Sequence, residues 1–132
     1  MIVKFGVETT ERACMIDVTE QVRRIVAESG VAAGVCHVYS PHTTAAIVVN
    51  EGADPAVVRD IVVHLDKTVP WGAAYQHREG NAASHIKAAL AGHVATTFVE
   101  SGDLLLGRWQ SIFFCEFDGP KSREVWVKVV SD

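Results

Sequence analysis

The sequence predicts a single α+β domain with mostly antiparallel strands and about three helices. The chain has 132 residues, the size of one ordinary domain, and is too short for a TIM barrel of roughly 250 residues. About six or seven short segments have the apolar alternation or the β-branched composition of strands. Most connections between them are too short for parallel crossovers, which is typical of the α+β class.

The N-terminal part is predicted to form two strands and a helix. Residues 3–7 alternate apolar with polar or small side chains, which is typical of a half-buried strand. A second strand is expected over Cys14–Val18. Thr19 is then expected to cap a helix, and Gly30 is its expected C′ residue because glycine readily adopts the left-handed conformation found there.

The middle of the chain is predicted to contain two strands and a second helix. The strand over Val31–Tyr39 is expected to end at Pro41. Residues 45–49 form a continuous apolar run with β-branched members, which is typical of a short buried strand. Asp54 is followed by a proline, so the pair marks the N-cap and first position of a helix that runs to about Lys67.

A loop, a third helix and the remaining strands follow. Residues 69–79 contain Pro, Gly and aromatic residues without a period, which predicts a long loop, and loops of that kind are often functional. The helix is expected over residues 81–91, closed by Gly92. Further strands are expected over Val94–Glu100, over Leu104–Asp118 with Gly107 as a candidate bulge, and over Glu124–Val130.

Composition excludes several classes of protein. The net charge of −4 argues against general nucleic-acid binding, which usually requires a basic patch. No run of about 18 apolar residues is present, so no membrane span is expected, and the N-terminus lacks the apolar core of a signal peptide. The three cysteines (Cys14, Cys36 and Cys115) are far apart and odd in number, so they are expected to be reduced. These features predict a cytoplasmic protein.

The segment from Pro41 to Glu51 holds the first candidate site. His42, Thr43 and Thr44 lie at one end of its buried strand, and rigid strand ends often position functional groups. Asn50 and Glu51 at the other end are expected to lead into the next helix, with Glu51 a secondary candidate for chemistry. The structural alternative is that the threonines are turn residues and His42 is a satisfied surface histidine.

A second candidate site surrounds the start of the third helix. Gly80 and Asn81 open this helix, and the free backbone N–H groups at a helix N-terminus bind anions readily. His77 precedes this helix start, while His85 and Lys87 follow it. The segment is therefore a candidate site for a phosphate group. The alternative is an ordinary helix with surface histidines.

Glu116 and Gln110 lie on one face of a strongly apolar strand. An unpaired buried carboxylate costs several kcal/mol or shifts its pKa. Glu116 therefore needs a cation, a metal or a set of donors, unless it points to water from an edge strand. Arg123, with Lys121, lies at the next turn, where arginine can bind phosphate through a bidentate fork or simply belong to a charged turn.

The histidines permit either metal binding or acid–base chemistry. Of the six, His42, His77 and His85 lie among polar residues at element ends, and three imidazoles with an open position can form a catalytic zinc site. No H-E-x-x-H motif is present, so spacing alone does not decide for a metal. The same histidines without a metal could act as acid–base groups.

The order and spacing of several motifs resemble those of the YjbQ-like family, whose members are named secondary thiamine-phosphate synthases. The resemblance covers about residues 3–130 as a single YjbQ-like domain. The matching motifs are HTTAAIVVNEGADP, the Arg59-Asp60 pair, YxH, EGN, SHIKAALxG, GxWQxI and Glu116. The matched positions are His42, Thr43, Thr44, Asn50, Glu51, Asp54, Arg59, Asp60, His77, His85, Lys87, Trp109, Gln110 and Glu116.

The resemblance implies a sandwich-like β core, a homotrimer, and a polar pocket at or near subunit contacts. It also implies a transferase that joins a pyrimidine pyrophosphate to a thiazole phosphate and releases pyrophosphate. Such a reaction needs positive charge on the leaving group, and Lys87, Arg123 and the helix start at Asn81 are candidates to supply it. The sequence has no Asp-rich magnesium cluster, so thiamine phosphate synthesis is expected to be a secondary activity.

Three hypotheses follow for the site. In the first, an enzyme uses His85, His42 and Glu116 as catalytic groups, and the substrate is held by Thr43, Thr44, Asn81, Lys87, Gln110 and Arg123. His42, His77 and His85 are the candidate ligands of a divalent metal, zinc or magnesium. In the second hypothesis the chain is a non-catalytic metal- or small-ligand-binding trimer. In the third the polar residues form a structural network at a subunit interface.

Overall fold

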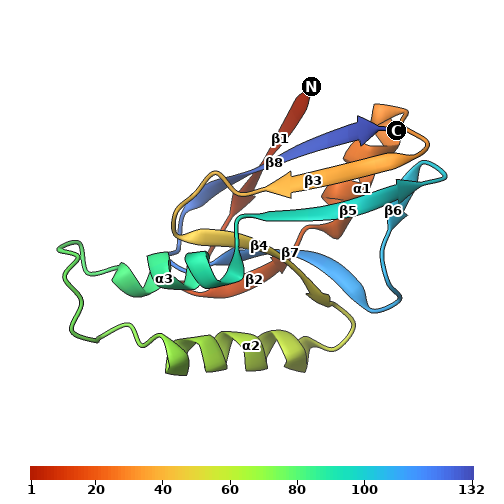
Figure 1. The fold of residues 1–132 in the computed structure, drawn as a ribbon. Coiled ribbons are helices and arrows are strands. Elements are labelled where there is room, and N and C mark those ends of the chain that lie inside the picture. The colour runs from red at the N-terminus through yellow and green to blue at the C-terminus, as the bar shows by residue number, and fades with distance from the viewer.

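Residues 1–132 are all described in the computed structural model, which contains eight strands in two antiparallel sheets (Figure 1). The five-stranded sheet has the order β1-β8-β3-β5-β6, built from β1 (Ile2–Glu8), β3 (Gly34–Tyr39), β5 (Val94–Glu100), β6 (Asp103–Leu105) and β8 (Ser122–Ser131). The three-stranded sheet has the order β2-β7-β4, built from β2 (Cys14–Asp17), β4 (Ala45–Glu51) and β7 (Gln110–Glu116). The expected α+β class with antiparallel pairing is confirmed.

The main hydrophobic core lies between the two sheets. Val38 and Val127 of the longer sheet and Ile47 and Phe114 of the shorter sheet all belong to it and are almost completely buried. Helix α1 (Thr19–Ser29) adds Val22 and Val26 to the same core, so that it packs at one end between the sheets. Two inner faces that pack in this way form a sandwich.

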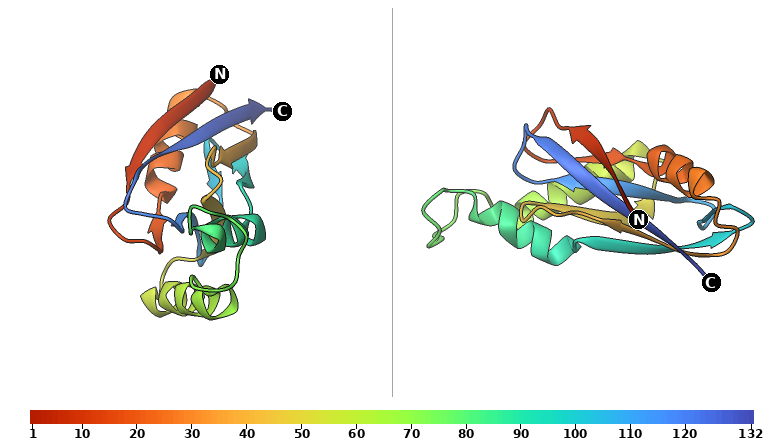
Figure 2. Two further views of the ribbon diagram at one scale, coloured as in Figure 1. Left: turned by 90° about the vertical axis from the view of Figure 1, so that its left-hand side faces the viewer. Right: turned by 90° about the horizontal axis from the view of Figure 1, so that it is seen from above.

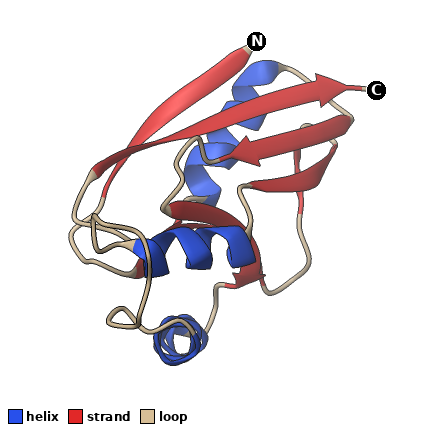
Figure 3. Ribbon diagram, turned by 60° about the vertical axis from the view of Figure 1, so that its left-hand side comes forward, coloured by secondary structure: helices blue, strands red, loops and turns tan.

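The other face of the three-stranded sheet is covered by the remaining helices, α2 (Pro55–Thr68) and α3 (Ala82–Ala91) (Figure 3). Phe113, Cys115 and Ala46 of the sheet pack there against Ala88 of α3. The shorter sheet is therefore buried on both faces, which explains the continuous apolar run in β4 and β7. In contrast, all three helices lie away from the outer face of the five-stranded sheet. The two chain termini lie close together (Figure 2).

Most of the predicted helix ends agree with the structure, including Gly92 at the C-terminal end of α3. Asp54 Oδ1 accepts a hydrogen bond from the N–H of Ala56 at 2.9 Å, which confirms the predicted N-cap of α2. Gly30 ends α1 with φ of 72°, as expected for a left-handed C-terminal residue. The expected cap at Thr19 is wrong. Its hydroxyl instead accepts the N–H of Ile112 at 2.9 Å and ties the helix to β7.

The predicted long strand over residues 104–118 is also wrong. The structure divides it into β6, which pairs with β5, and β7, which pairs with β2 and β4 in the other sheet. Gly107 lies in the connection, where its N–H donates to Gln110 Oε1 at 2.7 Å, so it makes a turn and not a bulge. Apolar alternation continues across such a change of sheet, which is why the pattern did not show it. The third strand begins at Gly34 and not at residue 31.

The longest helix, α2, has 14 residues, and none of the helices has both the length and the apolar character needed to span a membrane.

A substitution at Gly34 tests the close pairing of β3 with β8. A Cβ atom at this residue would lie 1.9 Å from the carbonyl oxygen of Val130, so the two strands would have to separate. We expect Gly34→Ala to lower the free energy of unfolding by about 2–3 kcal/mol or more, in the upper range for overpacking. Gly72→Ala is the matched control, because a Cβ there meets nothing within 4 Å. Urea unfolding that gave both variants the same midpoint would contradict the register.

Candidate functional site

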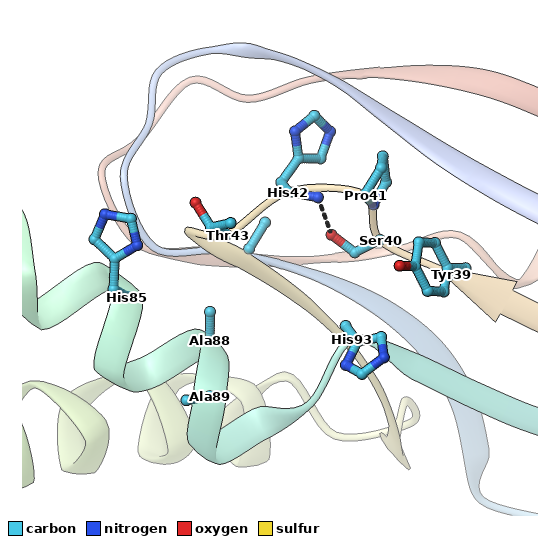
Figure 4. A pocket seen from close by; sticks show the side chains of 10 residues that line it. Tyr39, Ser40, Pro41, His42, Thr43, His85, Ala88, Ala89 and His93 are labelled. Atoms are coloured by element: carbon cyan, nitrogen blue, oxygen red, sulfur yellow. Dashed lines mark hydrogen bonds between the residues drawn. The ribbon is translucent and has the colours of Figure 1, made fainter.

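A groove of about 450 Å³ lies between α3 and the connection from β3 to β4 (Figure 4). Its polar lining comes from three separate parts of the chain: the β3–β4 connection, α3, and the residue before β5. The polar lining residues are Ser40, His42, Thr43, His85 and His93, and the others are Tyr39, Pro41, Ala45, Ala88 and Ala89. The small alanine side chains at the wall leave room for a ligand.

Local backbone interactions place the groove residues. The N–H of Ser40 donates to the carbonyl of His93 at 2.8 Å, which joins the end of β3 to the start of β5. Pro41 follows, and the Ser40 hydroxyl accepts the N–H of His42 at 3.3 Å, so the chain turns tightly before β4. Figure 4 shows His85 on α3 at the end of the groove nearest Thr43, with His93 toward the other end.

A buried ion pair lies beside this turn. The guanidinium of Arg123 on β8 donates to both carboxylate oxygens of Glu116 at the end of β7, through Nε to Oε1 at 2.8 Å and through a terminal nitrogen to Oε2. Glu116 is fully buried and Arg123 is 6 % exposed. The Thr9 hydroxyl and the N–H of Asp118 also donate to Glu116, at 2.8 and 3.0 Å. Glu116 was predicted to need a cation, a metal or a set of donors, and Arg123 with these two donors meets that need inside the chain.

The hydrogen-bond donors around Glu116 affect its pKa more than its burial does. Burial alone would raise the pKa of this carboxyl group. Hydrogen bonds from Arg123, the Asp118 N–H and Thr9, together with the charge of Arg123, hold its pKa below the ordinary value. Glu116 is therefore an ionised structural carboxylate and not a proton donor at neutral pH.

The same guanidinium holds the turn that carries the groove residues. A terminal nitrogen of Arg123 donates to the Thr44 hydroxyl at 2.9 Å. Thr44 is 5 % exposed and directly follows Thr43 in the turn. Arg123 and Thr44 were predicted to bind substrate, and Glu116 to be catalytic. The structure directs these three side chains toward one another, so they position the turn.

His42 has one ring nitrogen engaged within the chain. Its Nε2 accepts the N–H of Glu124 at 2.9 Å, and its ring lies perpendicular to the Phe114 ring with the centroids 6.3 Å apart. Burial lowers the pKa of His42, and the charge of Arg123 lowers it further, against opposing contributions from Glu124 and Glu116. Because an N–H donates to Nε2, the neutral ring with its proton on Nδ1 is the form that fits.

His77 lies next to His85, near the first turn of α3. Their ring centroids are 5.2 Å apart and their planes nearly perpendicular. His42 does not join them, and no three His, Cys, Asp or Glu side chains of one chain converge as a metal site would require. The predicted set of His42, His77 and His85 therefore does not form a closed zinc or magnesium site within one chain.

Lys87 and Asn81 are engaged in contacts between elements. Lys87 is 2 % exposed and forms an ion pair with Asp66 of α2, with its amine 5.9 Å from the centroid of the Phe117 ring. Asn81 donates from Nδ2 to Asp118 at 3.0 Å, while its buried Oδ1 has no partner. Neither side chain lines the groove, although both were predicted to bind substrate.

Gln110 lies at the far end of the shorter sheet. It is the register partner of Glu51, whereas Glu116 is the partner of Ala45 beside the groove. Gln110 and the groove are therefore separated by the length of β4. The structure brings together His42, Thr43 and His85 and does not bring Gln110 to them.

Tyr39 and His93 were missed by sequence reasoning. Their rings meet edge to face at 5.3 Å, and both line the groove. Tyr39 is paired in register with Val94, the residue after His93. The pairing of β3 with β5 is the signal that would have found them, and a single sequence does not show which strands pair.

The Glu116–Arg123 pair gives a stability prediction. Arg123→Ala leaves a buried carboxylate unpaired, so we expect it to lower the free energy of unfolding at pH 7 by about 3–5 kcal/mol. Lys121→Ala is the control, because its partial exposure makes its pair with Asp118 worth less than about 1 kcal/mol. Urea unfolding measures both.

The pH dependence of the same pair has a defined sign. The lowered pKa of Glu116 means that its stabilisation is present above its ordinary value of 4.5 and is lost as pH falls through the lower folded value. The deficit of Arg123→Ala should therefore shrink in acid, where Glu116 is protonated. A deficit that stayed constant from pH 7 down to acid would contradict this account.

His42 gives a second pH prediction. Since its pKa is lowered, its ring should titrate below the ordinary value of 6.5, and acid should favour the unfolded chain, in which the ring takes up its proton more readily. Nitrogen-15 NMR of the imidazole measures this midpoint and shows which nitrogen holds the proton. A midpoint above 6.5, or a neutral ring protonated on Nε2, would show that the Glu124 contact is misassigned.

Comparisons of the chain with a family model and with known proteins all indicate the same family. Residues 3–132 match the model of the family described as UPF0047 protein YjbQ-like. The UPF0047 protein MJ1081 of Methanocaldococcus jannaschii is 42% identical over 132 residues, which cover 100% of this chain and 96% of that protein.

Two solved structures are also similar. A protein of the yjbq/upf0047 family from Clostridium acetobutylicum is 48% identical with a TM-score of 0.96, covering 97% of this chain and 99% of that one. A protein from Sulfolobus solfataricus, described as YbjQ-like and of unknown function, is 31% identical with a TM-score of 0.96 and covers 100% and 97%. These names give a family and no reaction. The family resemblance seen in the motifs is confirmed, and the chain belongs to the YjbQ/UPF0047 family.

Proposed function

We propose that the groove binds a small phosphorylated substrate and supports transfer of the thiamine-phosphate synthase type, as a secondary activity. The observation that carries this proposal is the meeting of His42, Thr43, His85 and His93, from three separate parts of the chain, around one open groove. In the proposed reaction the nitrogen of a thiazole phosphate attacks the carbon that carries the pyrophosphate of the pyrimidine. The carbon–oxygen bond breaks, and pyrophosphate leaves.

His85 is the proposed acid in this reaction. None of the ten residues lining the groove is Lys or Arg, because Lys87 and Arg123 are paired with carboxylates elsewhere. Charge on the leaving pyrophosphate would therefore be met by protonated imidazole and by the Thr43 hydroxyl. His42 with a free Nδ1–H is a second donor. Glu116, Arg123 and Thr44 position the turn and touch no substrate.

A metal has no assigned step in this proposal. One chain supplies the adjacent His77 and His85 rings but no third ligand beside them, so the side chains do not fit a complete site for zinc or magnesium. We further propose that the protein acts as a cytoplasmic homotrimer, as the family resemblance implies, with a small molecule rather than nucleic acid or membrane as its ligand.

The second candidate is a non-catalytic site for a small ligand in the same oligomer. The observation that favours it is the same absence of lysine and arginine from the groove lining, because displacement of pyrophosphate normally uses strong positive charge. The groove would then bind a ligand through its imidazole and hydroxyl groups without turnover.

His85→Ala separates the two candidates. If His85 is the acid, the variant should lose thiamine phosphate formation by about 10²- to 10⁴-fold, the usual contribution of a general acid. His64→Ala on the exposed side of α2 is the matched control and should retain activity. The assay follows thiamine phosphate from the pyrimidine pyrophosphate and the thiazole phosphate.

Three results decide between the proposals. Loss of turnover with an intact fold supports the enzyme. Wild-type protein that binds phosphorylated ligands without turnover, and loses binding in His85→Ala, supports the non-catalytic site. Full activity in His85→Ala would overturn the role of His85.

A further inference from the structure

A second hollow, of about 340 Å³, lies between α1 and the five-stranded sheet and shares no lining residue with the groove. Its volume falls in the range of small-molecule sites. The sheet contributes Val3 of β1 with Val127 and Val129 of β8. Val3 is paired in register with Val127, and Val129 follows two residues later, so the three side chains share one face. They form an apolar floor.

The hollow exists because α1 covers the inner face of this sheet only in part. Val22 and Val26 of α1 are fully buried in the main core. Ile25, one residue before Val26, is only partly buried beside that core, as is Val129. Met1 also lines the hollow, but it is 98 % exposed and does not fill it. An apolar space large enough for a ligand is therefore left at the surface.

One carboxylate lies at the rim of this hollow. Ile25, Glu28 and Ser29 are spaced three and four residues apart, so they share the face of α1 that lines the hollow. The Ser29 hydroxyl is already engaged, because it donates to the Val26 carbonyl at 2.6 Å and accepts the N–H of Val31 at 3.2 Å. Glu28 is exposed and is the one lining residue with an ionisable side chain.

The charge of Glu28 is not compensated by the surrounding chain. The C-terminal end of a helix carries a partial negative charge, and the last turn of α1 contains no basic residue. Arg24 lies one turn before Glu28, but the two form no ion pair, and neither do Glu28 and the Met1 ammonium group. The rim of an apolar hollow is therefore negatively charged and suits a cation.

We propose that this hollow binds a small primary amine with an apolar chain. The chain lies on the valine floor and against Ile25, and the ammonium group binds the Glu28 carboxylate at the end of α1. A divalent metal is excluded as the ligand, because one carboxylate supplies too few oxygen atoms for it. An anion is disfavoured by the charge of the rim. The inference does not depend on the reaction proposed for the groove.

A series of unbranched amines tests the apolar floor. We expect butylamine, hexylamine and octylamine to bind progressively more tightly, by about three- to fourfold for each methylene that becomes buried. Isothermal titration calorimetry measures the dissociation constants, and methyl NMR shifts at Val3, Ile25 and Val129 locate the site. Equal affinity for the three amines, or shifts confined to other surfaces, would overturn the proposal.

The charge of the ligand and of Glu28 tests the rim. At low salt octylamine should bind at least about fivefold more tightly than octanoate, the upper range for an exposed ion pair, and added salt should reduce this preference. Glu28→Gln should lower the preference to about twofold or less. Glu20→Gln is the matched control, because Glu20 lies in the first turn of the same helix and its side chain is 81 % exposed. A preference that survived Glu28→Gln would show that the ammonium group binds elsewhere.

Filling the hollow tests its role without removing the carboxylate. In Val129→Phe the larger side chain takes the space of at least two methylenes, so octylamine should bind at least about tenfold more weakly. Val130→Phe is the matched control, because it makes the same change on the opposite face of β8. Val3→Phe fills the hollow from β1 and replaces Val129→Phe if circular dichroism shows that variant to be unfolded. Unchanged affinity in a folded, filled variant would contradict the site.

Discussion

The ion pair between Glu116 and Arg123 joins the two sheets at the end of the sandwich where the groove lies. Glu116 ends β7 of the shorter sheet, and Arg123 is the second residue of β8 in the longer one. Thr9, after β1, and Thr44, before β4, complete its hydrogen bonds. A buried pair that lost one partner would leave a charge without compensation, so the surrounding strands are held in one arrangement.

The groove depends on this pair through Thr44. With Thr44 held by Arg123, the preceding His42 and Thr43 line the groove, and the N–H of Glu124, next to Arg123, donates to His42 Nε2. The same arrangement removes Arg123 from the groove, as the Asp66 contact removes Lys87. The groove therefore offers imidazole and hydroxyl groups without a permanent cation.

Local sequence signals predicted most of the fold. Asp54 with its proline and Gly30 marked helix ends through backbone chemistry that operates within a few residues. Glu116 was expected to need a cation, a metal or a set of donors, because removing a carboxylate from water has a cost wherever it lies. Its partner could not be named, since that depends on how β7 and β8, in different sheets, face each other.

Pairing between strands that are distant in the sequence accounts for the predictions that were wrong or incomplete. Residues 104–118 continue one apolar alternation through a change of sheet. His93 enters the site because β3 pairs with β5, which places it beside Tyr39. The site predicted from His42, Thr43 and His85 is brought together, while Lys87, Arg123 and Gln110 are assigned elsewhere by contacts between distant elements.

Native-state hydrogen exchange of Arg123→Lys tests most directly whether this pair holds the groove. Lysine keeps a positive charge but cannot bind Glu116 and Thr44 through one planar fork. The amides of Phe117 and Glu124, which donate to the Thr44 carbonyl and to His42 Nε2, should lose protection at least about tenfold more than the amides of the β3–β5 ladder. Equal changes at both places would show that the turn at Thr44 does not depend on Arg123.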